Sequence, residues 1–212
     1  MQWPAAIFVE RKDPSVSRIL PDVSLDIIFR DARSYNRWQD KPVSDVTLQA
    51  IYDLLRWGPT SANCSPARFT FLRSQQAKER IKPHLIGSNV DKVMTAPVTV
   101  IVGHDPKFYD RIPELFPHNP EAREWFSGDA AVAEATAFRN GTLQGAYLIV
   151  AARALGLDCG PMSGFDNAGV DREFFSDGQV KSNFLCALGY GSTELLFDRG
   201  PRLGFDDACT LL

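Results

Sequence analysis

Helical periodicity marks three segments of the chain. After Ser44, a residue suited to cap a helix, apolar positions recur at helical spacing and stop at Gly58-Pro59. The predicted buried stripe of this helix is Val46, Ile51, Leu54 and Leu55. The longest helical pattern runs from Asp129 to Leu155 and ends at Gly156. A shorter helix is expected at Ser24, capped by that residue, with an apolar side made of Leu25, Ile28 and Phe29.

Strand patterns alternate with these helices. Residues 68–73 alternate in polarity, as a strand with one buried face does. The run PVTVIVG at 97–103 is continuously apolar and β-branched, which is typical of a strand buried on both faces. Residues 184–188 form another such run, and a further strand is expected after Gly156. Because helices and strands are interleaved with few hairpin signals, the pattern predicts an α/β or α+β domain with helices covering a sheet.

Two stretches fit neither period. Residues 1–22 contain three prolines and mixed charges, and we expect an N-terminal arm there. Residues 105–128 are rich in proline, aromatic and charged residues and are expected to be a long excursion between core elements. No internal repeat divides the remainder, so residues 23–212 are predicted to form a single domain.

Composition and charge exclude several classes of protein. With 212 residues, 44% of them hydrophobic, the chain can bury a core and is not disordered. A net charge of −3 argues against a nucleic-acid partner. The longest apolar run, residues 146–152, is too short to span a membrane, and the N-terminus lacks the basic start of a signal peptide. Four cysteines without paired spacing predict reduced thiols, so we expect a cytoplasmic protein.

Common catalytic motifs are absent from the sequence. It contains no GxxxxGK[ST] phosphate loop, no GxGxxG after a strand, no GxSxG and no HExxH. The histidines His84, His104 and His118 lack the spacing of a metal site, so no metal is expected. If the chain is an enzyme, its difficult step is therefore expected to be carried out by a bound cofactor.

Polar clusters at the ends of predicted elements are the candidates for binding. In residues 33–37 (RSYNR) a guanidinium beside a hydroxyl suits a phosphate monoester, although a solvated basic turn has the same composition. Residues 58–66 (GPTSANCSP) place small hydroxyl and amide side chains between prolines. Such a loop could bind the edge of a planar heterocycle, or it could simply connect a helix to a strand.

Two more clusters follow along the chain. Asn89 and Lys92, three residues apart on a helical turn, face the same way. Their amide and ammonium could bind a pyrimidine-like carbonyl edge, and the alternative is a solvated helix face. Residues 160–166 (GPMSGFD) lie between a predicted strand and a helix. Their glycines allow close approach of a ligand to free N–H groups, or they form a tight turn.

The order of these clusters, followed by RGPRL at 199–203, resembles the FMN-dependent nitroreductase superfamily over residues 24–212. The strings that carry the resemblance are GPTSANCSPARF at 58–69, ALGLDCGPMSGFD at 154–166, TAPV at 95–98 and AFRN at 137–140. Within the superfamily they are most similar to the RutE-like malonic semialdehyde reductases, the 3-hydroxypropanoate dehydrogenases of pyrimidine degradation. Other members carry the name NADH dehydrogenase/NAD(P)H nitroreductase. The resemblance implies an α+β fold, a mostly antiparallel central sheet covered by helices, and a homodimer with FMN at its interface.

The resemblance also implies a role for individual residues. The phosphate would bind Arg33, Ser34, Asn36 and the C-terminal Arg202, and the pyrimidine edge would bind Asn89 and Lys92. The loop over the flavin ring and ribityl chain falls on Pro59, Thr60, Ser61 and Asn63. Flavin N5 and O4 would receive backbone N–H groups of Ser163 and Gly164, with Pro161 beside them. The sequence departs from the family pattern at Ala32, where many members have a further arginine, and at Ser65 and Ala67-Arg68.

The activity implied is ping-pong hydride transfer from NADH or NADPH through flavin N5, with malonic semialdehyde reduced to 3-hydroxypropanoate. Lys92 would stabilise negative charge on the flavin. Arg68 or Arg139 could bind the substrate carboxylate, the alternative being a surface ion pair. Two other functions stay open: a broad NAD(P)H nitro or quinone reductase, and a non-enzymatic flavin-binding protein.

Overall fold

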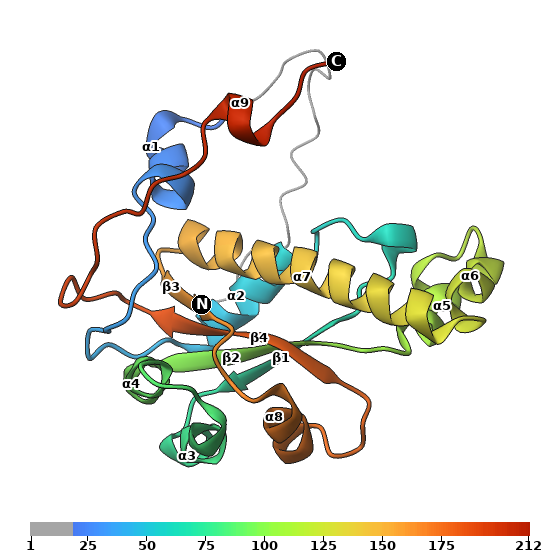
Figure 1. Cartoon of the computed structure of the whole chain (residues 1–212), viewed down its shortest axis with the longest axis horizontal. Coiled ribbons are helices and arrows are strands. Elements are labelled where there is room, and N and C mark those ends of the chain that lie inside the picture. Colours follow the sequence, from blue (N-terminus) through green and yellow to red (C-terminus); the bar gives the residue numbers. More distant parts are fainter. Residues whose placement is uncertain (1–18) are drawn as a thin grey trace.

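The computed structural model describes residues 19–212, which form a sheet covered by helices on both faces (Figure 1). The expected N-terminal arm therefore lies almost entirely outside the described residues. The sheet has four strands in the order β1-β2-β4-β3, and every neighbouring pair is antiparallel. The strands are β1 Ala67–Leu72, β2 Val98–His104, β3 Asp158–Met162 and β4 Lys181–Gly189. The α+β class is confirmed.

The burial of each strand agrees with its place in the sheet. Every residue of β2 is buried, as its unbroken apolar run predicts for a strand in the middle of a sheet. Strands β1 and β3 form the two edges, and their patterns are interrupted by Arg68 and by Gly160-Pro161. A proline is tolerated on an edge strand because its missing N–H is not needed by a neighbour.

Helices α2 (Asp45–Leu55) and α7 (Ala130–Ala154) cover one face of the sheet (Figure 1). Their apolar side chains share a core with β2, β3 and β4 that includes Ile51, Leu148 and Val100. The other face is covered by α3 (Gln75–Ile81), α4 (Asn89–Thr95) and α8 (Asn167–Phe174), whose core includes Val93 and Leu185. Short 3-10 turns η2 (Ser61–Asn63) and η3 (Lys82–His84) join helices to the next elements.

The excursion at 105–128 has a small core of its own. It contains η4 (Phe108–Arg111), α5 (Ile112–Leu115), η5 (Pro120–Arg123) and α6 (Glu124–Ser127). The side chains of Phe108, Ile112 and Phe126 pack together against Ala133 and Ala137 of α7. The excursion therefore extends the body of the protein beyond one end of the sheet (Figure 1).

The chain ends project from this body. The helical turns α1 (Asp22–Leu25) and η1 (Asp26–Arg30) lie above α7, and the segment after Ser192, with α9 (Phe205–Ala208), lies near them (Figure 1). All residues from 197 to 212 are exposed. Within residues 19–212, no helix combines the length and the apolar character needed to cross a bilayer.

Some expectations about helices were wrong in detail. Ser44 caps α2 as predicted, because its Oγ accepts a hydrogen bond from the Thr47 N–H at 3.1 Å. However, Val46 and Leu54 of the predicted buried stripe are exposed, and Leu48 is buried instead. Ser24 is not a cap: the helix begins at Asp22, where Pro21 precedes it. Of its expected apolar side, Leu25 and Ile28 are half-buried and Phe29 is 55% exposed, because α1 and η1 lie beside α7 and not on the sheet.

Candidate active site

The predicted phosphate segment lies against the edge strand β3. Ser34 forms a parallel bridge with Cys159, and the Tyr35 N–H donates to the Cys159 carbonyl at 3.0 Å. Glycine at position 160 permits this approach, because a Cβ there would lie 2.5 Å from the Tyr35 carbonyl oxygen. A Cβ on Gly191 would lie 2.2 Å from the Tyr35 ring. Residues 33–38 are therefore held beside β3 by close backbone packing, which leaves the Ser34 side chain exposed.

Helix α4 is bound to the same edge. The Asn89 Nδ2 donates to the Gly164 carbonyl at 3.0 Å, so the helix start is joined to the loop that follows β3. The Trp38 indole N–H donates to the Lys92 carbonyl at 3.1 Å, and Arg37 pairs with Asp91 at 3.2 Å. Asn89 and Lys92 lie on one helix, as the spacing predicted.

Lys92 is the predicted residue of this edge whose pKa is shifted by its surroundings. Its side chain is half-buried, and its Cδ would lie 3.2 Å from a Cβ on Gly160. Burial lowers the pKa of the ammonium below its ordinary value of 10.5. An ammonium that has lost part of its hydration gains more from an anionic ligand than a fully solvated one does.

The structure thus brings together the predicted residues of the phosphate segment, α4 and the loop after β3. We call this set the β3-edge site, and it consists of Arg33, Ser34, Asn36, Asn89, Lys92, Pro161, Ser163 and Gly164. It offers guanidinium, hydroxyl, amide and ammonium donors, which suit a ligand with a phosphate at one end and carbonyl oxygens at the other.

The two C-terminal arginines differ in what they contact in this chain. The Arg202 Nη1 donates only to the carbonyls of Gly200 and Pro201 beside it. Arg199, three residues earlier, donates from Nη2 to the Ala32 carbonyl at 3.1 Å, and Arg33 donates to the Phe197 carbonyl. The tail thus reaches the phosphate segment through Arg199 and Phe197, while Arg202 does not touch it in this chain.

The predicted flavin loop, Pro59–Asn63, is fixed to the excursion and to α7. The Asn63 Nδ2 donates to the Leu115 carbonyl at 2.8 Å. The Ser61 N–H donates to Oδ1 of Asn140, which is 1% exposed, at 2.9 Å. Ala62, Asn63 and Ser65 all have positive φ, a costly conformation for residues other than glycine that recurs at functional sites.

Within the described chain the two parts of the predicted site do not meet. Helix α4, which carries Asn89 and Lys92, lies at one end of the sheet, and α5, which the loop contacts through Leu115, lies at the other end (Figure 1). None of the hydrogen bonds among residues 19–212 joins the loop to the β3-edge site.

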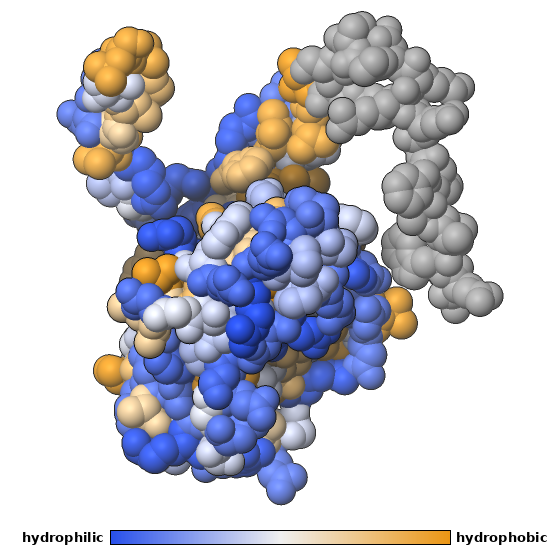
Figure 2. All heavy atoms as spheres, turned by 90° about the vertical axis from the view of Figure 1, so that its right-hand side faces the viewer, coloured by the Kyte–Doolittle hydropathy of each residue, from blue (hydrophilic) through white to orange (hydrophobic). Residues whose placement is uncertain are grey.

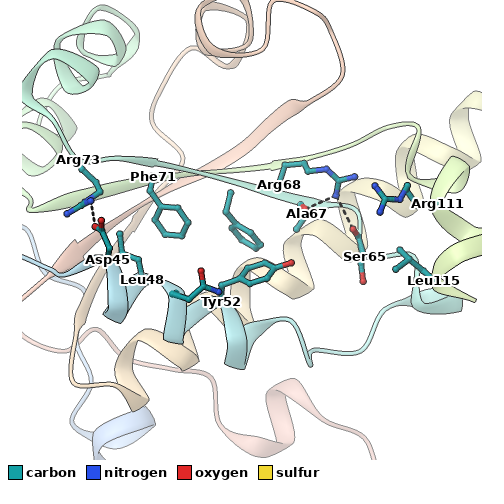
Figure 3. A pocket seen from close by; sticks show the side chains of 12 residues that line it. Asp45, Leu48, Tyr52, Ser65, Ala67, Arg68, Phe71, Arg73, Arg111 and Leu115 are labelled. Carbon is teal, nitrogen blue, oxygen red and sulfur yellow. Dashed lines mark hydrogen bonds and ion pairs between the residues drawn. The ribbon is translucent and has the colours of Figure 1, made fainter. Parts of the chain in front are cut away.

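A groove of about 660 Å³ lies beside the flavin loop, between α2 and the edge strand β1 (Figure 3). Tyr52, Ser65, Phe69 and Leu115 are among its lining residues. Arg68 lies in it too, but its guanidinium pairs with Asp105 at 2.7 Å and donates to the carbonyls of residues 65–67.

Arg139, the other predicted substrate residue, differs from Arg68 in its surroundings. It lies on the exposed side of α7, next to Asn140, and forms no ion pair with any other residue of 19–212. Of the two arginines it is thus the one whose charge is not neutralised by a carboxylate of the described chain.

Sequence reasoning missed four residues that organise the site: Trp38, Asn140, Gln144 and Arg199. Asn140 and Gln144 are one helical turn apart, and Gln144 Oε1 accepts from the Ala67 N–H at 2.9 Å. A signal did exist, because two amides interrupt the buried face of a long helix and lie beside Gly141 and Gly145. Buried amides of that kind need partners, and here the partners are the loop and the start of β1.

No cluster of histidine, cysteine or acidic residues that could hold a metal ion occurs within residues 19–212. All four cysteines are free thiols, and Cys64, Cys159 and Cys186 are buried.

Two named bacterial proteins are similar to this chain over most of its length. A protein of Ralstonia pickettii with the provisional name NADH dehydrogenase/NAD(P)H nitroreductase HadB is 59% identical over 191 residues, which cover 89% of this chain and 97% of that protein. A Cupriavidus pinatubonensis protein with the same provisional enzyme name is 57% identical over 189 residues, covering 88% of this chain and 96% of that protein.

Solved structures share the fold at low sequence identity. A provisionally named nitroreductase of Bacillus subtilis, YdfN, superposes with a TM-score of 0.80 at 20% identity, covering 91% of this chain and all of that chain. A nitroreductase-like protein of Exiguobacterium sibiricum, solved in complex with FMN, gives 0.79 at 19% identity and covers 93% of this chain and all of its own. The family model described as "Nitroreductase family" matches residues 30–191. The chain therefore belongs to the Nitroreductase family.

Proposed function

We propose that this protein is an FMN-dependent NAD(P)H oxidoreductase whose cofactor binds at the β3-edge site. The observation that carries the proposal is the convergence of Arg33 and Ser34 with Asn89 and Lys92 on one strand edge. Membership of the Nitroreductase family supports this activity, and so do the names of the two relatives, which both include NAD(P)H nitroreductase. The FMN bound by a structural neighbour supports the choice of flavin.

The donor set fits FMN chemically. When bound, FMN supplies hydride transfer between NAD(P)H and an oxidised acceptor. Arg33 and the exposed Ser34 hydroxyl would bind the phosphate through charge-assisted hydrogen bonds, with Asn36 as a further donor. Arg202, which donates only to its neighbours Gly200 and Pro201 in this chain, is the weaker of the predicted phosphate ligands. Asn89 and Lys92 bind the pyrimidine edge, and the ammonium of Lys92 stabilises negative charge there. Pro161, Ser163 and Gly164 bring the loop backbone to the central ring.

The second part of the site comes from another copy of the chain, because Pro59, Thr60, Ser61 and Asn63 do not reach the β3-edge site of their own protomer. A homodimer is also supported by large apolar side chains that lack cover. These include Trp57 just after α2, Phe138 and Leu143 on α7, and Phe197 and Phe205 on the tail. Hydrophobic side chains gather on the segments that project from the body (Figure 2). Exposed apolar side chains gathered in this way are typical of a protein interface.

For the acceptor we propose malonic semialdehyde, reduced to 3-hydroxypropanoate in pyrimidine degradation. Arg139 supports this assignment, since its guanidinium has no carboxylate partner among residues 19–212 and lies beside the loop-binding Asn140. Arg68 is a weaker candidate for the substrate carboxylate, because Asp105 already neutralises it. The four free thiols support a reducing compartment, so we place the enzyme in the cytoplasm.

A broad nitro or quinone reductase is the second candidate function, and the names of the relatives favour it. The two are separated by comparing kcat/KM for malonic semialdehyde with kcat/KM for a nitroarene. A matched Arg139→Gln variant sharpens the comparison. If the carboxylate binds Arg139, only the semialdehyde reaction is expected to lose efficiency.

The decisive experiment is the visible spectrum of the purified protein. We expect the protein to contain a bound flavin whose visible absorbance is bleached by NADH or NADPH under anaerobic conditions. Malonic semialdehyde should then restore that absorbance. A bound flavin that neither nucleotide bleaches would point to the non-enzymatic flavin-binding protein. A colourless protein that gains no thermal stability from added FMN would contradict the proposal altogether.

A further inference from the structure

We propose that Trp38 is the positioning residue for Lys92, so that the electrostatics of the flavin site depend on an indole that need not touch the flavin. This inference rests on the proposed function, because it assigns Trp38 a role toward bound FMN through Lys92. No feature of the sequence pattern singles out Trp38 from the polar segment in which it lies.

The first contact is the hydrogen bond between the two residues. The Trp38 Nε1–H donates to the Lys92 carbonyl at 3.1 Å. Helix α4 has only seven residues, and Ser88 at its N-terminus provides no side-chain cap. So short a helix has little stability of its own. Its position therefore depends on contacts from outside, which include the buried Val93 side chain and the bond from Asn89 to Gly164. The Trp38 bond is the one that reaches the backbone of the residue that carries the ammonium.

The second contact is steric. The Trp38 ring lies over two glycines: a Cβ on Gly160 would be 3.2 Å from the ring Cζ2, and a Cβ on Gly189 would be 3.0 Å from Cε3. The same Cβ on Gly160 would lie 3.2 Å from the Cδ of Lys92. Indole and lysine stem thus share the space above Gly160, and the ring limits where the stem can lie.

The neighbouring ion pair does not replace this anchor. Arg37 and Asp91 join the same two segments, but their side chains are 28% and 68% exposed. Exposed pairs contribute little, because solvent screens them and both side chains lose entropy. The half-buried indole is therefore the contact that fixes α4 relative to residues 33–38, the segment with the proposed phosphate ligands.

The consequence concerns the distance between the Lys92 ammonium and the flavin. If the phosphate is bound by Arg33 and Ser34, the flavin is placed by the segment that ends in Trp38. The indole then sets how far Lys92 lies from the pyrimidine edge. Charge stabilisation in a partly desolvated site weakens as this distance grows, so loss of the indole N–H should disfavour the more negatively charged, reduced form of the cofactor.

The test is the midpoint potential of FMN bound to the full-length protein in the Trp38→Phe variant, which keeps an aromatic ring and removes the N–H donor. We expect the preference of the site for reduced over oxidised FMN to fall about tenfold, which is a potential about 30 mV more negative for a two-electron couple. Trp125→Phe is the matched control, because Trp125 is exposed on α6 and its indole N–H donates to no other residue of 19–212. Its potential should equal that of the unmodified protein.

A double-mutant cycle separates positioning from a merely structural role. In a Lys92→Ala background, Trp38→Phe should add no further shift. An unchanged potential in Trp38→Phe would overturn the proposal, and so would an equal shift with or without Lys92. If the Phe variant fails to fold, benzothienylalanine at position 38 removes only the N–H and gives the same readout. FMN binding by the unmodified protein is measured first, since its absence would refute the proposed function itself rather than the positioning role alone.

Discussion

At the scale of single residues, the proposed phosphate ligands and the proposed ring ligands of the β3-edge site lie on different elements. Arg33 and Ser34 lie on a segment fixed to β3, whereas Asn89 and Lys92 lie on α4. Each pair of residues can therefore be tested with a flavin analogue that lacks the part of FMN that the pair is proposed to bind.

Arg33→Ala should weaken FMN binding about 10- to 100-fold, as expected for the loss of a charge-assisted hydrogen bond. Riboflavin, which has no phosphate, should bind the variant and the unmodified protein equally. Flavin fluorescence titration measures both constants. Arg202→Ala is the matched variant, and the side chains of this protomer predict a smaller effect because Arg202 bonds only to its neighbours. Equal losses for FMN and riboflavin in Arg33→Ala would show that Arg33 does not bind the phosphate.

We expect Lys92 to make the affinity of the site for FMN depend on pH. Burial lowers its pKa, so the free protein loses the ammonium at a pH below the ordinary 10.5. A ligand that binds the charged form raises that pKa, and by linkage its affinity falls as the pH rises through the lowered value. We expect FMN affinity to decline on the alkaline side before pH 10.5, and Lys92→Arg to remove the decline because a guanidinium stays charged. Titrations at increasing pH check this, and a decline that persists in Lys92→Arg would assign it to another group.

At the scale of elements, the predictions that the structure confirms are those that rest on strong local sequence patterns. The Ser44 cap, the buried β2 and the limits of α7 follow from periodicity and capping, which act over a few residues. The exposed Val46 and Leu54 could not be predicted, because the face of α2 that is buried depends on how α7 crosses it. Trp38 and Asn140 were missed for the same reason, since their partners are 54 and 79 residues away in sequence.

The contact between β3 and the phosphate segment is the element-level feature most sensitive to a small change. In Gly160→Ala the new methyl would lie 2.5 Å from the Tyr35 carbonyl oxygen, so residues 33–38 must move outward. We expect a loss of about 1–3 kcal/mol in the free energy of unfolding, as for other overpacked sites, together with weaker FMN binding.

Gly128→Ala is the matched control, because a Cβ there would have its nearest neighbour at 3.9 Å. Urea unfolding of this variant should show unchanged or slightly raised stability, since alanine restricts the unfolded chain. Full FMN affinity in Gly160→Ala would mean that the backbone contact beside β3 does not position the phosphate ligands.

At the scale of the whole molecule, the two parts of the proposed site in the described chain do not face each other. Its loop at 59–63 lies by α5, its β3-edge site lies by α4, and uncovered apolar side chains lie on α2, α7 and the tail. The proposed twofold dimer would explain all three observations, because each chain would supply a loop to its partner and cover the partner's apolar surface.

Mixing two inactive variants tests this arrangement directly. Arg33→Glu removes the phosphate ligand, and Ser61→Tyr places a bulky side chain on the exposed flavin loop, so neither homodimer should bind FMN. If each site takes its loop from the partner, a heterodimer contains one intact site and one doubly altered site. After the variants are unfolded and refolded together, about a quarter of the sites should bind FMN if the protomers pair at random. If one protomer instead supplied the whole site, every site in the mixture would carry one of the two changes, and mixing would restore no binding.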